Sequence, residues 1–322
     1  MTEKSLNPEV DQSLRKFLQD VRFGAQGGVI TDLDGTAVHE DAGRIYLPPP
    51  VEAGLKQLYE LGRPVVLNSL RFPLSIMRTF GKEWLEISGA PVPAVSMNGS
   101  QLGFVMRDAQ GDLAFEEITA FPLQPDEIEN VLAGVEALLA GDVKDVLLFY
   151  YPRDWRMGEI IWTPVAEKVI AVKEKYRSAS SVTAVELGKL REQLMSEDIC
   201  MIFLLIERPA DQLMAYQHSR PSSFFTHAGV NKLSGTKEIA ERLGIDLAES
   251  IGAGDSPMDS FLNGVGLAVH VGPLEIEFRG LHDTVRVQNS FELGDLLFRI
   301  AELQRELGLE TAQPLENLNI AG

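Results

Sequence analysis

Apolar residues recur at two spacings in the first hundred residues of the chain, and the two kinds of segment alternate. Apolar positions three or four apart predict amphipathic helices over residues 8–23, 48–62 and 72–88. Short continuous apolar runs predict buried strands at residues 29–31, 64–68 and 94–97. Because strands and helices alternate, this part of the chain is expected to form a parallel α/β sheet.

The pattern changes after Gly99 and returns near Phe224. Two apolar runs flank the turn residues 108–111 and predict a hairpin. Further helices are predicted over residues 125–140 and 165–177 and within 183–196, and further strands over residues 145–151, 159–163 and 199–206. Hairpins mixed with helices are typical of an α+β domain. After Phe224 the alternation resumes, with helices over residues 232–243 and 291–306 and strands over residues 250–254, 266–269 and 284–287.

These segments predict an α/β protein with one domain inserted into another. The core is expected to comprise residues 1–101 and 223–307, and the inserted α+β domain residues 102–222. A length of 322 residues exceeds that of a usual single domain and fits this division. The polar tail, residues 308–322, is expected to be poorly ordered.

The net charge of the chain limits the classes of binding partner that are expected. The chain has 29 Lys and Arg against 47 Asp and Glu, a formal charge of −18. Such a surface repels nucleic acid and anionic membranes, so neither is expected as a partner. It also repels a phosphorylated substrate, so a phosphate site here must supply its own positive charge. A divalent cation could do this.

The cysteine content and the absence of targeting segments indicate the compartment. Cys200 is the one cysteine of the sequence and lies in an apolar run, where a small core residue is expected. One cysteine excludes an intrachain disulfide. The sequence shows no signal-peptide hydrophobic region and no apolar run of membrane-spanning length. We expect a cytoplasmic protein that is a monomer or a homodimer.

The strongest chemical signal is Asp32-Leu33-Asp34-Gly35-Thr36, directly after an apolar strand. The carboxyl ends of strands in open α/β sheets line the ligand crevice. A carboxylate at Asp32 can attack phosphorus and form an aspartyl-phosphate. Asp34 can protonate the leaving alcohol and then take a proton from the hydrolytic water. The alternative is a strand end with solvated acids.

A second acidic loop, Gly254-Asp255-Ser256-Pro257-Met258-Asp259, also follows an apolar run. Mg²⁺ prefers oxygen ligands and keeps several waters. Asp32, Asp255 and the main-chain carbonyl of Asp34 could therefore hold it, and Asp259 could orient a metal-bound water. Taken alone, this loop fits a helix N-terminus with acidic capping residues equally well.

Two further residues complete a candidate phosphate site. Ser69 follows an apolar strand, so its hydroxyl and N–H can face a phosphate. Lys232 begins a predicted helix and can neutralise the nucleophile and the transferred group. A lone serine or lysine is usually a solvated surface residue, and only their order along the chain gives these two weight.

Taken together, these segments resemble the haloacid dehalogenase superfamily, and within it the Cof-type sugar-phosphatase-like branch, over roughly residues 28–299. The segments that carry the resemblance are Asp32 to Thr36, Asn68-Ser69-Leu70-Arg71, Val95 to Ser100 with Asn98, Lys232, and Gly254 to Asp259. The resemblance implies a Rossmann-like core, a type-2 α/β cap inserted between the second and third motifs, Mg²⁺, and phosphoryl transfer through an aspartate. It also implies that phosphate or substrate contacts Ser69, Leu70, Arg71 and Asn98.

Three positions depart from the family pattern. Leu70 stands where glycine is usual, and Met258 stands where asparagine is common. The segment from Val269 through His270 to Pro273 replaces a stretch that usually carries asparagine. These departures leave the nucleophile, the acid/base residue, the lysine and the leading metal carboxylate untouched.

Within the inserted domain, the segment Tyr150-Tyr151-Pro152-Arg153-Asp154-Trp155-Arg156 combines aromatic and basic residues. Aromatic rings can stack on a sugar, and Arg153 and Arg156 could bind a carboxylate or a second phosphate bidentately. A strand end with solvated arginines is the alternative.

The sequence thus predicts a Mg²⁺-dependent phosphatase that acts on a small phosphorylated metabolite, of the sugar phosphate or phosphoglycerate type, through an aspartyl-phosphate. A phosphomutase remains possible, because Asp34 would serve both reactions. A non-catalytic binding protein on the same scaffold is a third possibility. Met258 and the His270 segment favour it, whereas the intact set of Asp32, Asp34, Lys232 and Asp255 opposes it.

Overall fold

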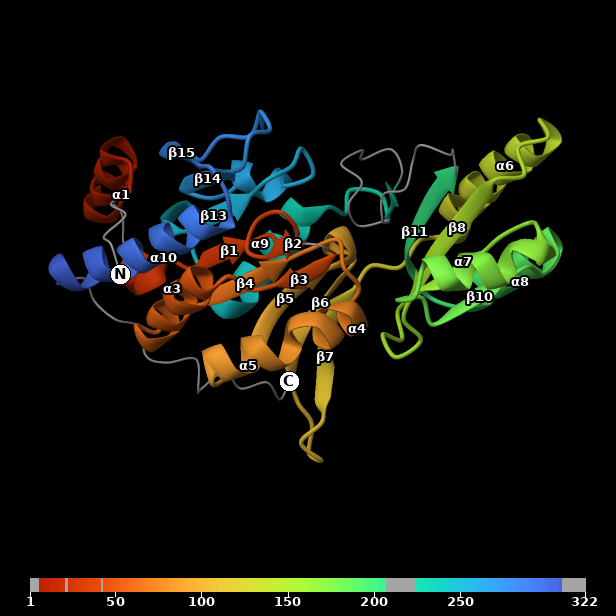
Figure 1. Cartoon of the computed structure of the whole chain (residues 1–322), viewed down its shortest axis with the longest axis horizontal. Coiled ribbons are helices and arrows are strands. Elements are labelled where there is room, and N and C mark those ends of the chain that lie inside the picture. The colour runs from red at the N-terminus through yellow and green to blue at the C-terminus, as the bar shows by residue number, and fades with distance from the viewer. Residues whose placement is uncertain (1–5, 21–22, 42, 207–223, 309–322) are drawn as a thin grey trace.

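The computed structural model describes residues 6–20, 23–41, 43–206 and 224–308. Its larger sheet has eight strands in the order β15-β14-β13-β1-β4-β5-β6-β7 (Figure 1). Their bounds are β1 Val29–Thr31, β4 Val65–Asn68, β5 Val92–Ser96, β6 Gln101–Arg107, β7 Leu113–Ala120, β13 Ile251–Gly254, β14 Leu267–Val271 and β15 Asp283–Val287. The strands from β15 to β5 are parallel, and β6 and β7 are antiparallel additions.

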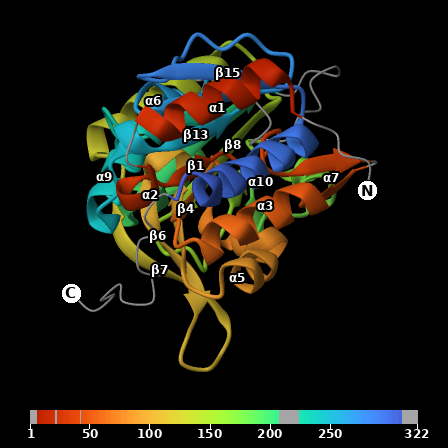
Figure 2. The same cartoon turned by 90° about the vertical axis from the view of Figure 1, so that its left-hand side faces the viewer.

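Helices cover both faces of this sheet, because neighbouring strand residues point to opposite sides. In β1, Val29 packs in the apolar cluster that contains α1, α3, α5 and α10, whereas Ile30 packs in the cluster that contains α9. Figure 2 shows α3 beside α10 on one side of the sheet. The helix bounds are α1 Pro8–Asp20, α2 Phe23–Gln26, α3 Pro49–Glu60, α4 Pro73–Ile76, α5 Lys82–Ser88, α9 Lys232–Leu243 and α10 Ser290–Glu306. The predicted α/β core is confirmed.

The segment predicted as one helix over residues 72–88 is interrupted. A π-helical stretch, Met77–Gly81, separates α4 from α5. A small hairpin of β2 (His39–Asp41) and β3 (Arg44–Tyr46) was not predicted, because its strands are short and largely exposed.

A smaller unit, here called the cap, lies beyond one end of the core sheet (Figure 1). It contains a five-stranded sheet in the order β10-β9-β8-β11-β12. Its elements are α6 Pro125–Ala140, β8 Val146–Pro152, β9 Ile160–Trp162, α7 Val169–Lys175, β10 Ser181–Thr183, α8 Leu187–Ser196, β11 Ile199–Ile206 and β12 Phe224–Phe225. Helices α6 and α8 pack on one face of this sheet, and α7 packs on the other.

The pairing of two segments corrects the predicted domain boundaries. The hairpin β6–β7, which we assigned to the inserted domain, extends the core sheet, because β6 pairs with β5 through Ser96 and Gln101. The tight turn at Met97–Gly99 places β6 beside the open edge of β5. Strand β12, which we assigned to the core, pairs with β11 of the cap. We therefore propose that the inserted unit spans residues 121–225.

Two segments for which the sequence makes predictions lie outside the described residues. The tail predicted to be poorly ordered lies outside the described residues from position 309 onward, as do residues 207–223 of the inserted domain. Among the helices of the described ranges, none is long and apolar enough to cross a membrane. Cys200 is buried in the cap, as expected of a core residue.

Candidate active site

Three adjacent parallel strands bring residues from distant parts of the sequence to one edge of the core sheet. Strand β1 lies between β13 and β4 and is parallel to both. Asp32, Ser69 and Asp255 directly follow β1, β4 and β13, respectively. Because carboxyl ends of parallel strands meet at one edge, the three residues lie at the same edge of the sheet, where open α/β sheets bind ligands.

Lys232 is held at the first turn of α9 and points into the acidic residues. Its Nζ lies 2.6 Å from Oδ1 of Asp32 and 2.6 Å from Oδ1 of Asp259. The helix starts here because the Asn231 side chain accepts hydrogen bonds from two backbone N–H groups of the first turn. Asn68 then fixes this turn by donating to the carbonyl of Lys232 (3.1 Å). Lys232 is only 2% exposed, so its ammonium is committed to the two carboxylates.

Three carboxylates gather around this lysine. Oxygens of Asp32, Asp255 and Asp259 all lie within 4.8 Å of one another. Three carboxylates and one ammonium leave a formal charge of −2, which one divalent cation would neutralise. Oδ2 of Asp259 also accepts from the backbone N–H groups of Asp255 (3.0 Å) and Ser256 (2.9 Å). Asp259 thus uses both oxygens on the protein and orders the loop, which leaves Asp32 and Asp255 as the carboxylates suited to bind an ion.

The electrostatics of the cluster favour binding of a divalent cation. Burial, reinforced by repulsion from Asp259, raises the pKa of Asp255 to about 7. Burial also raises the pKa of Asp32 well above its usual value, although the Lys232 charge opposes the rise. For Lys232, burial lowers the pKa, but attraction to Asp259 and Asp32 outweighs it and the net pKa is raised. Ionised carboxylates are therefore costly here, and a hard divalent cation such as Mg²⁺ would stabilise them.

The turn after Asp32 explains why glycine and threonine follow Asp34. Gly35 has a φ of 81°, and a Cβ at this position would lie 2.2 Å from Oδ2 of Asp255. A side chain here would therefore push against the second acidic loop. The hydroxyl of Thr36 donates to Oδ1 of Asp255 (3.3 Å). Sequence reasoning missed this contact, since the two residues are 219 positions apart.

Asp34, the predicted acid/base residue, is held by Arg71. The guanidinium donates from Nε and Nη2 to the two oxygens of Asp34, each at 2.7 Å. Arg71 also donates to Ser75 (3.0 Å) and lies over the ring of Phe80, and it is 3% exposed. Such a bidentate pair fixes the orientation of the carboxylate. Direct contact of Arg71 with phosphate, and of the Asp34 main chain with a metal, stay predictions.

The loops after β4 and β5 hold each other in place. The Ser69 hydroxyl accepts from the N–H of Arg71 (3.1 Å), and the Ser69 carbonyl accepts from the N–H of Asn98 (3.3 Å). Met97 and Asn98 have φ values of 49° and 58°, in the left-handed region. Gly99 approaches α9 so closely that a Cβ there would lie 2.3 Å from the carbonyl oxygen of Asn231. The structure thus brings Ser69 and Asn98 together.

The three residues that depart from the family pattern, Leu70, Met258 and His270, are buried and contact other parts of the structure. Leu70 and Met258 are both buried in an apolar cluster shared with the cap. His270 lies in β14 and is buried, and its Nε2 donates to the carbonyl of Phe278 (2.8 Å). This hydrogen bond holds the irregular segment that follows β14 against the strand.

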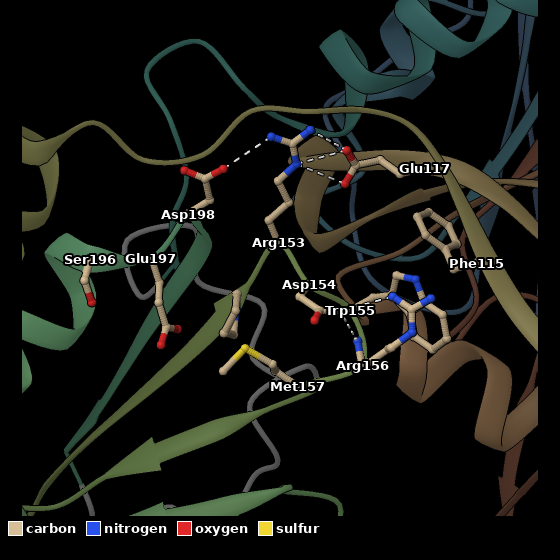
Figure 3. Close-up of a pocket in the computed structure, with 11 residues that line it drawn as sticks. Phe115, Glu117, Arg153, Asp154, Trp155, Arg156, Met157, Ser196, Glu197 and Asp198 are labelled. Atoms are coloured by element: carbon tan, nitrogen blue, oxygen red, sulfur yellow. Dashed lines mark hydrogen bonds and ion pairs between the residues drawn. The ribbon is translucent and has the colours of Figure 1, made fainter. Parts of the chain in front are cut away.

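Arg153 and Arg156, predicted to contact substrate, lie in the β8–β9 loop beside a cavity of about 800 Å³ (Figure 3). Arg153 is ion-paired with Glu117 of β7 (2.7 Å) and with Asp198 of the cap (3.3 Å). Arg156 is exposed and lies over the ring of Trp155. In the described residues, the partners of these arginines are Glu117, Asp198, Asp154 and Trp155 rather than Asp32, and their contact with substrate stays a prediction.

Comparison with known proteins identifies the family. The sequence profile of haloacid dehalogenase-like hydrolases matches residues 29–273, most of the chain. The chain belongs to this family. The match spans the core motifs and the whole cap, and it shows that the protein is a hydrolase of the haloacid dehalogenase type.

Solved structures of the family share the fold over most of this chain. A subclass IIB sugar phosphatase superposes with a TM-score of 0.60 at 18% identity, covering 88% of this chain and 99% of that one. A phosphatase from Bacteroides thetaiotaomicron gives 0.58 at 14% identity, covering 89% and 96%. A HAD/Cof-like hydrolase from Plasmodium vivax gives 0.61 at 14% identity, covering 90% and 99%. At these identities the likeness establishes the fold.

Among curated proteins, the chain is similar to the β subunit of glycine–tRNA ligase from Streptococcus pneumoniae. The alignment is 26% identical over 147 residues, which is 45% of this chain. It covers 19% of the ligase subunit, so the chain spans only about a fifth of that relative. Ligase activity is not transferred to this chain on that basis.

Proposed function

We propose that this chain is a Mg²⁺-dependent phosphatase that hydrolyses a small phosphorylated metabolite through an aspartyl-phosphate on Asp32. The observation that carries the proposal is the Lys232 ammonium between Asp32 and Asp259, beside Asp255, at the carboxyl edge of the sheet. Membership of a hydrolase family whose solved relatives include phosphatases supports it.

The residues of this cluster have different roles in the proposed reaction. Asp32 provides the carboxylate oxygen that attacks phosphorus in line and displaces the alcohol. Lys232 fixes this carboxylate and would stabilise negative charge on the phosphoryl oxygens. Asp32 and Asp255 would hold the cation, which when bound neutralises charge on the transferred group.

Asp34, two residues after Asp32, is the residue we propose for proton transfer. It would give a proton to the departing alcohol oxygen and then take one from the water that hydrolyses the aspartyl-phosphate. Its bidentate contact with Arg71 holds the ionised carboxylate in the orientation needed to take the proton of the water, and one of the two hydrogen bonds must open when Asp34 carries the proton for the alcohol. The main-chain and side-chain groups of Ser69, together with Asn98, would position the phosphate.

Turnover of p-nitrophenyl phosphate tests the proposal. The wild type should release phosphate only with Mg²⁺, and Asp32→Asn should abolish turnover. Asp41→Asn is the matched control, because Asp41 is exposed on β2 and carries no catalytic role. Retained turnover in Asp32→Asn would contradict the mechanism. With a sugar phosphate as substrate, an isomerised sugar phosphate in place of free phosphate would indicate a mutase.

A further inference from the structure

A polar side chain of the core sheet faces the helix that carries Lys232. In β4, alternate residues point to opposite faces of the sheet, and Val66 belongs with Ile239 of α9 to one apolar cluster. Asn68 lies two residues further along the strand, on the same face, and is 0% exposed. An apolar residue would match these neighbours. Burial of an amide in such a place is costly unless its hydrogen bonds are made.

The amide donates to two groups in the first turns of α9. Its Nδ2 lies 3.1 Å from the carbonyl oxygen of Lys232 and 2.6 Å from Oγ1 of Thr236. The hydroxyl of Thr236 donates to the same carbonyl oxygen (2.7 Å). Because a carbonyl oxygen only accepts hydrogen bonds, the NH₂ group of Asn68 must be the part of the amide that faces it.

This orientation leaves the other atom of the amide without a partner. Oδ1 of Asn68 is buried and has no hydrogen bond to any of the described residues. A buried acceptor that makes no hydrogen bond costs stability, and a valine at this position would not carry that cost. The stability of the fold alone therefore gives little reason for an amide here.

Asn68 connects two groups that take part in the proposed reaction. In the chain it directly precedes Ser69, whose N–H donates to the carbonyl of Val95 (2.9 Å). Through its hydrogen bond to the carbonyl of Lys232, it also holds the residue whose Nζ lies 2.6 Å from Oδ1 of Asp32. A shift of α9 relative to β4 would therefore move the ammonium away from the nucleophile and from the Ser69 loop.

We propose that Asn68 is a positioning residue for phosphoryl transfer, and that its amide sets the distance between the Lys232 ammonium and the Ser69 loop. The proposal rests on the proposed function, in which both groups contact the phosphoryl group. A misplacement of about 1 Å costs on the order of a hundredfold in rate, so a small shift of α9 is enough to lower kcat.

The test measures kcat, KM and Tm of Asn68→Val, with p-nitrophenyl phosphate and Mg²⁺ at a temperature well below the Tm. Valine suits a buried strand and removes both the donor and the unpaired oxygen. We expect kcat to fall by about tenfold or more and KM to change by less than about threefold. The Tm should fall by no more than about 5 °C. A purely structural residue would lower the Tm and leave kcat of the folded protein unchanged.

Thr236 provides a matched pair of variants, because its hydroxyl donates to the same carbonyl oxygen as Asn68. Thr236→Val keeps the shape of the side chain and removes the hydroxyl, and it should lower kcat severalfold. Thr236→Ser keeps the hydroxyl and should recover most of this loss.

An unchanged kcat in Asn68→Val, or a Tm lowered by more than about 5 °C, would overturn the proposal. Equal kcat values in the two Thr236 variants would also overturn it. The proposed function is judged separately, by wild-type turnover and its loss in Asp32→Asn. A wild type without turnover would contradict the proposed function and this proposal together, whereas wild-type turnover that Asn68→Val retains would overturn this proposal alone.

Discussion

Replacing Lys232 by methionine should destabilise the folded protein strongly at neutral pH and above. The substitution keeps an unbranched side chain but removes the ammonium that contacts Asp32 and Asp259 at 2.6 Å. Lys232 is 2% exposed, and Asp259 is fully buried, so solvent screens neither charge. Breaking a buried ion pair by removing one partner costs about 3–5 kcal/mol, because the other partner is left charged and buried. We expect a loss of this size in the free energy of unfolding.

The loss should depend on pH in a defined direction. Burial already raises the pKa of Asp32, and Lys232 opposes that rise, so its removal should raise this pKa further. A carboxyl whose pKa is higher in the folded than in the unfolded state favours folding as pH falls toward the unfolded value. Acidification would then replace the lost ammonium by protons, and the destabilisation should be smaller at pH 5.5 than at pH 8.

Urea unfolding in EDTA at both pH values measures this effect. The control is Lys237→Met, which makes the same chemical change on the exposed side of α9. The control should change the free energy of unfolding by less than about 0.5 kcal/mol. Equal effects of the two substitutions, or a Lys232→Met loss that is the same at pH 5.5 and pH 8, would refute the reasoning from a buried charge cluster.

Three further predictions concern the metal and the acid/base residue. Mg²⁺ should raise the Tm more at pH 8 than at pH 6, because Asp255, with a pKa of about 7, must lose its proton to bind the ion; a pH-independent shift in Tm would contradict this. Gly35→Ala should cost about 1 kcal/mol or more and weaken the Mg²⁺-dependent rise in Tm, since the new Cβ meets Asp255; an unchanged Mg²⁺ titration would count against the close packing of the two loops. Arg71→Lys should lower kcat by about tenfold or more with a smaller change in KM, as a lysine cannot hold Asp34 bidentately; steady-state kinetics in which only KM changes would assign Arg71 to substrate binding.

The sequence predicted the core elements well because their signals are local. Apolar runs followed by turn residues identified β1, β4 and β13, and helical spacing identified α3 and α9. The hairpin β6–β7 was assigned to the wrong unit because its apolar pattern does not specify a partner. Strand pairing is a non-local choice, made here by the turn at Met97–Gly99.

The site was predictable as a set of loops, but not as a set of contacts. Acidic residues after apolar strands indicated Asp32 and Asp255, since strand ends of one sheet share an edge. The position of Arg71 in the sequence does not indicate that it pairs with Asp34. Likewise, the residue types around Arg153 do not indicate that it pairs with Glu117. These contacts depend on how elements pack, which residue types alone do not specify.

The charge of the site is the reason for which we propose a metal-dependent reaction on an anionic substrate. The chain as a whole carries −18, so its long-range field repels phosphate. Within the described residues, Lys232 and Arg71 are the cations that contact Asp32, Asp34 and Asp259, and each is already paired with carboxylates. Four carboxylates and two cations leave −2 even at the site itself. A phosphate dianion placed there without a cation would meet net repulsion in a buried setting, where charge interactions are strong. One divalent cation would bring the local charge to zero, and for this reason we propose that Mg²⁺ binds before or with the phosphorylated substrate.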